Sequence, residues 1–188
     1  MNDGTSVKFQ FGTGGALELV DKKAVGTDVF TKKMIGALKN PQNVELKLIV
    51  KDDRIFIDSF GTGAVDSADM LGLSTTMFKA SLLHFIVERF AIADYEKNKA
   101  TTSHEDFEKA HLAGLGAEEE FLKEIYPKKT IKYRTEYLDK KSKVVDKDKN
   151  GTINYIIDFT DVQYVFTQPI VNGKVLENIT KSSIKVIK

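Results

Sequence analysis

The spacing of apolar residues changes three times along this chain of 188 residues, and these changes limit the folds open to it. In the first sixty residues apolar positions follow strand-like patterns, broken by one short helical stretch. From about residue 74 to residue 125 they recur every three or four residues, as in helices packed on a core. Beyond residue 130 the alternation typical of strands returns. Two helices between two β-rich ends predict an α+β fold.

The N-terminal part is predicted to have the element order ββαββ. Gly12–Gly15 can supply the positive φ angles that a tight reversal needs, so the first two strands should form a hairpin. Asp28 can cap the helix, and Pro41 ends it because proline disfavours helical geometry in the residue before it. The charged turn Lys51–Asp53 suggests a second hairpin. The predicted elements are strands at 7–11 and 16–20, a helix from Asp28 to Leu38, and strands at 44–50 and 54–60.

Two longer helices are predicted in the centre of the chain. Ser74 is a suitable N-cap for the first, which should run to about Tyr95 and be largely buried because it is apolar on most sides. Ser103 and Asp106 form a capping box that starts the second helix, which should end near residue 125. The apolar face predicted for the second helix consists of Phe107, Gly114, Leu115, Phe121, Leu122 and Ile125.

The C-terminal third is predicted to be an antiparallel β-meander with strands at 130–138, 152–159, 162–168 and 174–187. Asn172-Gly173 is a typical hairpin turn. Its aromatic residues are Tyr133, Tyr137, Tyr155, Phe159, Tyr164 and Phe166. These side chains either cover the helices or bind an unknown protein or peptide, and the pattern does not separate the two. We therefore expect an α+β part at 1–127 and a sheet at 128–188, packed together as a single domain.

Charge and composition exclude several classes of protein. The 28 Lys and Arg residues nearly balance the 27 Asp and Glu residues, so we expect neither nucleic acid nor a membrane surface as a partner. The N-terminus lacks the features of a secretory signal, and no apolar run is long enough to span a bilayer. The absence of cysteine excludes disulfides and thiolate chemistry. A soluble protein follows, either cytoplasmic or exported by a route that needs no cleavable signal.

The histidines carry the main chemical signal of the sequence. His84 and Glu88 are one helical turn apart on the first long helix, while His111 and Glu118 fall at the centre of the apolar face of the second. If these faces meet, the four residues form a metal site that suits zinc and would accept manganese or ferrous iron. His104, in the first turn of the second helix, is expected at the surface.

A second interpretation of the same residues needs no metal. Glu88 can form a hydrogen bond with His84 or pair with a lysine, in a non-catalytic binding or scaffold module. Gly114 lies between His111 and Glu118, where it costs about 1 kcal/mol relative to alanine. Its presence suggests that another backbone comes close at this point.

The arrangement of His84, Glu88, His111 and Glu118 resembles the zincin metallopeptidases, above all the small zincin-like domains at the ends of bacterial polymorphic toxins. In that family one helix carries HExxH or HExxE, and a later helix supplies a further ligand. The resemblance covers about residues 44–125 and implies His84 as first ligand, Glu88 in the place of the second, and His111 or Glu118 as the third. Phe85 replaces the general base of the family. The resemblance therefore implies either an altered base, Glu118 or Glu88, or a non-catalytic relative.

Two further motifs compete with the histidine site. Asp146, Asp148 and Asn150 match the first oxygen ligands of a calcium loop, but its twelfth position is Ile157 and strands rather than helices flank it. A polar hairpin turn accounts for the same residues. The glycine-rich segments at 11–15 and 60–64 lack the following helix and lysine of a phosphate loop, so we interpret them as turns.

Overall fold

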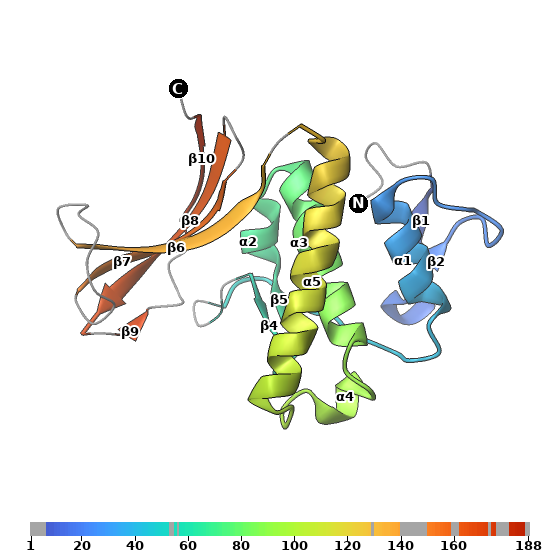
Figure 1. Ribbon diagram of the computed structural model, residues 1–188. Helices are drawn as coiled ribbons and strands as arrows, with labels where there is room; N and C mark the ends of the chain where they lie inside the picture. The colour runs from blue at the N-terminus through green and yellow to red at the C-terminus, as the bar shows by residue number, and fades with distance from the viewer. Residues whose placement is uncertain are drawn as a thin grey trace. The chain divides into compact units, whose positions relative to one another are not determined.

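The computed structural model describes residues 7–52, 55, 57–128, 130–139, 150–158, 162–172, 174–175 and 181–186. Helices and strands are both present, which confirms the predicted α+β class. The helices are α1 (Val29–Lys39), α2 (Ser67–Leu71), α3 (Thr75–Phe90), α4 (Tyr95–Asn98) and α5 (His104–Ile125), with a 3-10 turn at Thr13–Gly15 (Figure 1). The strands are β1 (Phe9–Phe11), β2 (Leu17–Leu19), β3 (Lys47–Ile49), β4 (Asp58–Ser59), β5 (Ala64–Asp66), β6 (Lys132–Asp139), β7 (Gly151–Asp158), β8 (Val162–Val171), β9 (Lys174–Val175) and β10 (Lys181–Val186).

The chain divides into two compact units that interleave along the sequence. The first unit contains Met1–Lys47, Phe60–Ala64 and Ser74–Pro127, and therefore both histidine-bearing helices. The second contains Leu48–Ser59, Val65–Leu73 and Lys128–Lys188.

The N-terminal hairpin and the first helix form as predicted. β1 and β2 pair antiparallel, and the turn between them places Gly14 and Gly15 at φ angles of 75° and 80°. Asp28 caps α1 by accepting a hydrogen bond from the backbone N–H of Thr31. The Phe30 ring packs edge-on against Phe9, at 6.4 Å between centroids, and lies tilted against Phe121 of α5, at 6.0 Å. These three rings join the hairpin, α1 and α5 in one core.

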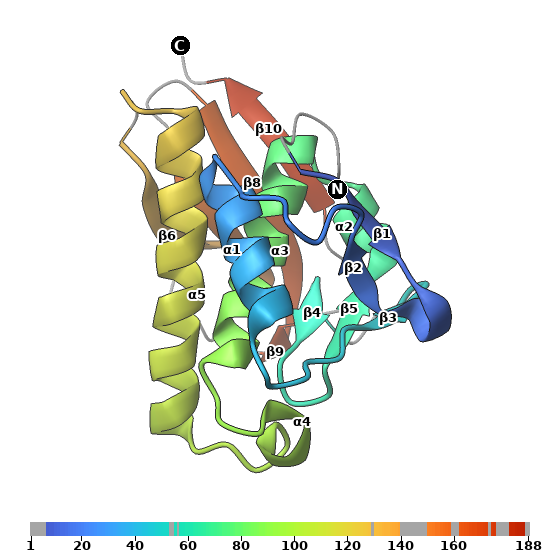
Figure 2. The same ribbon diagram turned by 90° about the vertical axis from the view of Figure 1, so that its right-hand side faces the viewer.

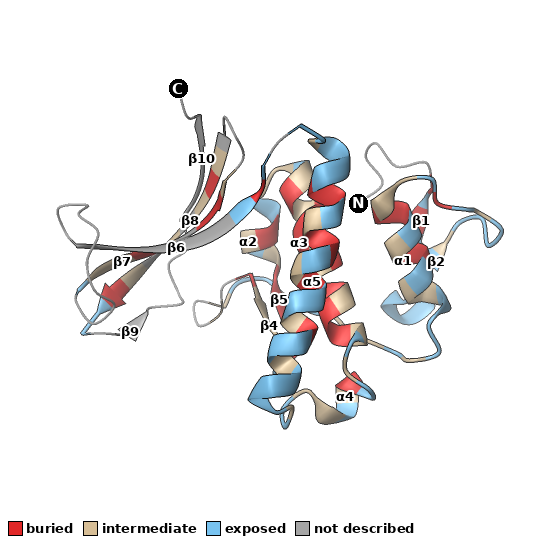
Figure 3. Cartoon of the chain, in the orientation of Figure 1, coloured by how far each residue is buried: buried red, intermediate tan, exposed pale blue. Residues whose placement is uncertain are grey.

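Helices α3 and α5 form the centre of the first unit and lie side by side, with α1 against both (Figure 2). Both N-caps are those that the sequence predicts: Ser74 accepts from the N–H of Met77, and Ser103 from that of Asp106. Helix α3 is buried along most of its length, whereas α5 keeps one exposed side (Figure 3). The prediction for the apolar face of α5 is wrong at Ile125, which is 47% exposed.

The first long helix ends five residues earlier than predicted. Helix α3 stops at Phe90, and Asp94 adopts a left-handed conformation with φ of 48° before the short helix α4. Tyr95 at the start of α4 is fully buried, and its hydroxyl accepts a hydrogen bond from Arg89 Nε while donating one to the carbonyl oxygen of Phe60. The tyrosine is therefore buried as expected, but on a separate helix that folds back on the end of α3.

The second predicted hairpin is wrong, because β5 lies between β3 and β4 in a three-stranded sheet. The three residues of β5 are all buried, so this strand shows no alternation by which it could be recognised. Asp66 ends β5 and caps α2 by accepting hydrogen bonds from the N–H groups of Ala68 and Asp69. Its second oxygen accepts from the N–H of Asp52, which ties the segment after β3 to β5.

The C-terminal sheet confirms the predicted meander, with the strand order β10-β8-β7-β6 and antiparallel pairing throughout. The predicted last strand is two strands, since Val175 pairs with Ile170 but Lys181 pairs with Thr167, in a different register along β8. Asn172 has the positive φ, 51°, expected in its turn. Of the six aromatic side chains singled out in the sequence, only Tyr164 lies within the described part, and it is buried.

We expect Asp66→Ala to lower the free energy of unfolding by about 2 kcal/mol or more, because three backbone N–H groups lose a buried acceptor. Urea denaturation measures the loss. Asp21→Ala is the matched control, since the Asp21 carboxylate also accepts a backbone N–H, from Lys23, but at an exposed turn. The control should change stability by about 0.5 kcal/mol or less. Equal losses in the two variants would contradict the role given to Asp66.

Candidate metal site

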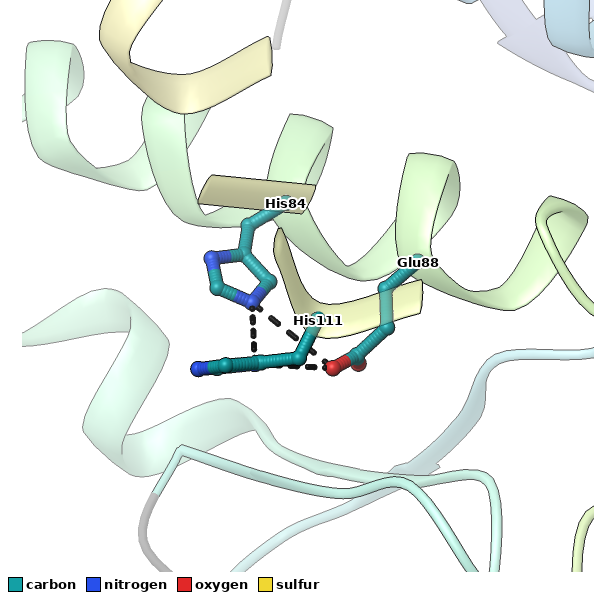
Figure 4. Close-up of side chains that lie close together, drawn as sticks. All are labelled: His84, Glu88 and His111. Carbon is teal, nitrogen blue, oxygen red and sulfur yellow. Dashed lines mark hydrogen bonds and ion pairs between the residues drawn. The ribbon is translucent and has the colours of Figure 1, made fainter. Parts of the chain in front are cut away.

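Three polar side chains from α3 and α5 converge on one point of the helix pair (Figure 4). His84 and Glu88 lie one turn apart on α3, and His111 reaches them from α5. His84 Nε2 is 3.1 Å from His111 Nδ1 and 3.8 Å from Glu88 Oε1, and Glu88 Oε1 is 3.0 Å from His111 Nδ1. These three atoms form a small triangle, which we call the donor triangle.

Burial differs across the donor triangle. Only 4% of the Glu88 side chain and 12% of the His84 side chain are exposed, whereas 37% of the His111 side chain is. The donor triangle is therefore closed towards the core and reaches solvent beside His111. The His111 ring also stacks on Phe107, one turn earlier in α5, with 5.6 Å between centroids. This stacking orients the ring.

Glu118 contacts the other side of His84. Its Oε2 lies 2.9 Å from His84 Nδ1, and its side chain is only 7% exposed. The two nitrogens of an imidazole point in different directions, so Glu118, which contacts Nδ1, lies outside the donor triangle formed around Nε2. A proton on Nδ1, donated to Glu118, leaves the Nε2 lone pair pointing into the donor triangle.

The surroundings shift the pKa values of two of these groups. Burial lowers the pKa of His84, but its hydrogen bond to Glu118 and the charges of Glu118 and Glu88 outweigh burial and raise that pKa to about 9. Burial raises the pKa of Glu88, but the hydrogen bond from His111 and the charges of both imidazoles outweigh it and lower that pKa to about 2. Glu88 is thus ionised at neutral pH, with imidazoles as its partners.

No arrangement of protons gives each of the three contacts of the donor triangle a hydrogen bond of its own. If His111 Nδ1 carries a proton, it donates to Glu88, and a second proton on His84 Nε2 would set two N–H groups against each other across 3.1 Å. If only His84 Nε2 is protonated, it donates to His111, and Glu88 then faces a lone pair. A cation accepts one lone pair from each atom.

The donor triangle has the dimensions and the chemistry of a divalent-metal site. Donors at about 2.0–2.1 Å from a tetrahedral zinc ion lie about 3.3 Å from one another, and the edges of 3.0, 3.1 and 3.8 Å bracket that value. Two imidazoles and one carboxylate are a donor set that zinc accepts. The group of His84, Glu88 and His111 could therefore hold a metal ion.

The structure brings together the four residues that the sequence singled out, but only three of them form the donor triangle. His84, Glu88 and His111 share the donor triangle, while Glu118 bonds to the outer nitrogen of His84. His104 is exposed at the start of α5, as expected. Asp146 and Asp148 of the alternative calcium motif lie outside the described residues. Sequence reasoning missed the stacking of Phe107 on His111, although the spacing of four residues indicates it.

Comparisons with protein-family models, with curated proteins and with solved structures found no significant match to this chain.

Within the described residues, no helix combines the length and the apolar character needed to cross a bilayer.

We expect the metal-free protein to lose stability as the pH rises from 6.5 to about 9. The folded-state pKa of His84 lies above its ordinary value of 6.5, so its contribution is complete below pH 6.5 and disappears as the pH passes 9. Glu88 acts in the opposite direction: its pKa is lowered from 4.5, so its contribution is complete above pH 4.5 and disappears as the pH falls towards 2.

Denaturant unfolding of chelator-treated protein across this range should show a loss on the order of 1–3 kcal/mol on the alkaline side. His84→Gln should flatten that slope, because glutamine does not titrate. His104→Gln changes an exposed histidine and should keep the slope of the wild type. An unaltered slope in His84→Gln would assign the alkaline loss to another group.

Proposed function

We propose that this protein binds one divalent metal ion, with zinc as the best fit, through His84 Nε2, Glu88 Oε1 and His111 Nδ1. The observation that carries the proposal is the convergence of these three donor atoms within a few ångströms. Because the exposed edge of His111 borders the donor triangle, a water molecule or a ligand oxygen can complete the coordination. Three protein ligands with one open position are typical of zinc sites that act on or bind other molecules.

Charge balance supports the proposal. Glu88 and Glu118 bring two nearly buried carboxylates to the helix pair, and a divalent cation would balance both while the two imidazoles stay neutral. The neutral total leaves no surplus positive charge to attract an anion. We therefore expect the open position to take water or a neutral oxygen ligand, such as a carbonyl group, in preference to phosphate.

The zincin-like resemblance agrees with the same assignment and remains part of the proposal. The resemblance implies His84 and Glu88 as the first two ligands and His111 as one of two possible third ligands. These three residues form the donor triangle. The family's general base has no counterpart, since the residue at its position, Phe85, is buried and has no group that accepts a proton. Glu88 serves as a ligand and Glu118 bonds to His84, so neither is free to activate water. We propose metal binding by a zincin-like relative that does not hydrolyse peptides.

A metal-free binding or scaffold module is the second candidate. It is favoured by the contacts that the four side chains make with one another, which pair Glu88 with His111 and Glu118 with His84. In this case the cluster only connects the two helices. A metal-binding measurement separates the two candidates.

Isothermal titration of the chelator-treated protein with Zn²⁺ should show one site per chain, and bound Zn²⁺ should raise the melting temperature. His84→Ala, Glu88→Ala and His111→Ala should each weaken binding by about 100-fold or more, since each removes one of three protein ligands. His104→Ala is the matched control: it removes an exposed histidine from the same helix as His111 and should bind like the wild type.

Binding below the detection limit in the wild type would leave the scaffold interpretation. Equal binding by the His84→Ala and His104→Ala variants would place the ion elsewhere. Cleavage of a peptide library by the zinc-loaded protein would contradict the proposal that no hydrolysis occurs. Loss of that cleavage in a Glu118→Ala variant that is still saturated with zinc would make Glu118 a base.

A further inference from the structure

Helix α5 presents a second set of residues to His84, apart from the ligand His111. Gly114 and Glu118 follow His111 by three and seven residues, so the three lie on one face of the helix. Gly114 faces the His84 ring and its backbone, and Glu118 faces its outer nitrogen. Gly114 thus lies against the Cδ2–Nε2 edge of the imidazole, and Glu118 against Nδ1.

The space at Gly114 admits no side chain. A methyl group there would lie 2.7 Å from His84 Cδ2 and 3.1 Å from Nε2, the nitrogen in the donor triangle. It would also lie 2.9 Å from the carbonyl oxygen of His84, which belongs to the backbone of α3 and has no rotamer by which to move away. An alanine would therefore push the ring and the helix away from α5, and with them the nitrogen that faces His111.

Glu118 controls the direction of the imidazole. Its carboxylate accepts from Nδ1 at 2.9 Å and is itself nearly buried, so it favours the form of His84 with the proton on Nδ1. Carboxylates that bond to the outer nitrogen of a metal-binding histidine fix both its tautomer and its orientation. Such a partner needs no direct contact with the ion.

We infer that Gly114 and Glu118 are positioning residues, which hold the His84 imidazole from two sides so that Nε2 points at Glu88 and His111. The inference rests on the proposed metal site and goes beyond it, because neither residue is a ligand. Gly114 sets the distance between α3 and the ring of His111, and Glu118 sets the rotation of the His84 ring. The two functions are separable by mutation.

Gly114→Ala and Gly116→Ala form the first test. Gly116 lies on the same helix but has no atom within 4 Å of an added methyl group, so its alanine variant reports only the helix propensity of the substitution. We expect Gly114→Ala to weaken Zn²⁺ binding by about tenfold or more, whereas Gly116→Ala should stay within about twofold of the wild type. Circular dichroism and denaturant unfolding of the metal-free proteins show separately whether each variant is folded.

Glu118→Ala and Glu118→Gln form the second test, which decides the matter if Gly114→Ala fails to fold. Removing the acceptor should weaken binding by about 10–100-fold. The glutamine amide oxygen can still accept from Nδ1, so Glu118→Gln should bind Zn²⁺ more tightly than Glu118→Ala, although it lacks the charge that helps to balance the ion. A general effect of removing a buried charge would affect both variants alike.

Visible absorption of the Co²⁺-loaded proteins supplies a readout that stability alone does not change. The wild type, Gly116→Ala and Glu118→Gln should share one spectrum of a low-coordinate ion, and Gly114→Ala and Glu118→Ala should differ from it. Wild-type affinity and spectrum in Gly114→Ala and Glu118→Ala would overturn the positioning roles and leave the metal site standing. No binding of Zn²⁺ or Co²⁺ by the wild type would overturn both.

Discussion

The imidazole of His84 connects α3 to α5 through both of its nitrogens, and the geometry of the whole cluster depends on it. Nδ1 meets Glu118 and Nε2 meets His111, at 2.9 and 3.1 Å. Buried polar groups need partners with good geometry, so these contacts fix how far along one another the two helices can lie. The shape of the donor triangle therefore depends on how α3 and α5 pack against each other.

The close approach at Gly114 makes this arrangement possible. A glycine inside a helix costs stability, and here the cost is offset by direct contact between α5 and the ring and carbonyl oxygen of His84. Phe107 adds a flat surface on which the His111 ring rests. One face of α5 thus provides His111 of the donor triangle, the Phe107 ring that stacks on it, a gap at Gly114 for the His84 ring, and the Glu118 carboxylate.

Features set by local chemistry could be predicted from the sequence. Ser74 and Ser103 start their helices as N-caps, and Gly14 and Gly15 take the positive φ angles that the first turn requires. Helical periodicity also predicted that His111 and Glu118 point inwards from α5. The same periodicity could not determine which nitrogen of His84 each partner contacts, because that depends on the rotation and separation of two helices.

The remaining differences arise where tertiary contacts outweigh local pattern. β5 is three residues long and wholly buried, so it carries no alternation, and it separates the two strands expected to pair. The apolar pattern of α3 continues to Ile92, but the chain turns at Asp94, where Tyr95 bonds to Arg89. Arg89 itself is fully buried, although its charge predicts the surface. Its guanidinium lies over the rings of Phe85 and Tyr95.

The interleaved course of the chain has a consequence for how the protein can be dissected. The polypeptide passes from one unit to the other five times, after residues 47, 59, 64, 73 and 127. A fragment that stops at Pro127 would keep every residue of the donor triangle. It would also keep residues 48–59 and 65–73 of the second unit but lack the rest of that unit, residues 128–188. Because the chain connects the two units at five points, no single proteolytic cut can separate them.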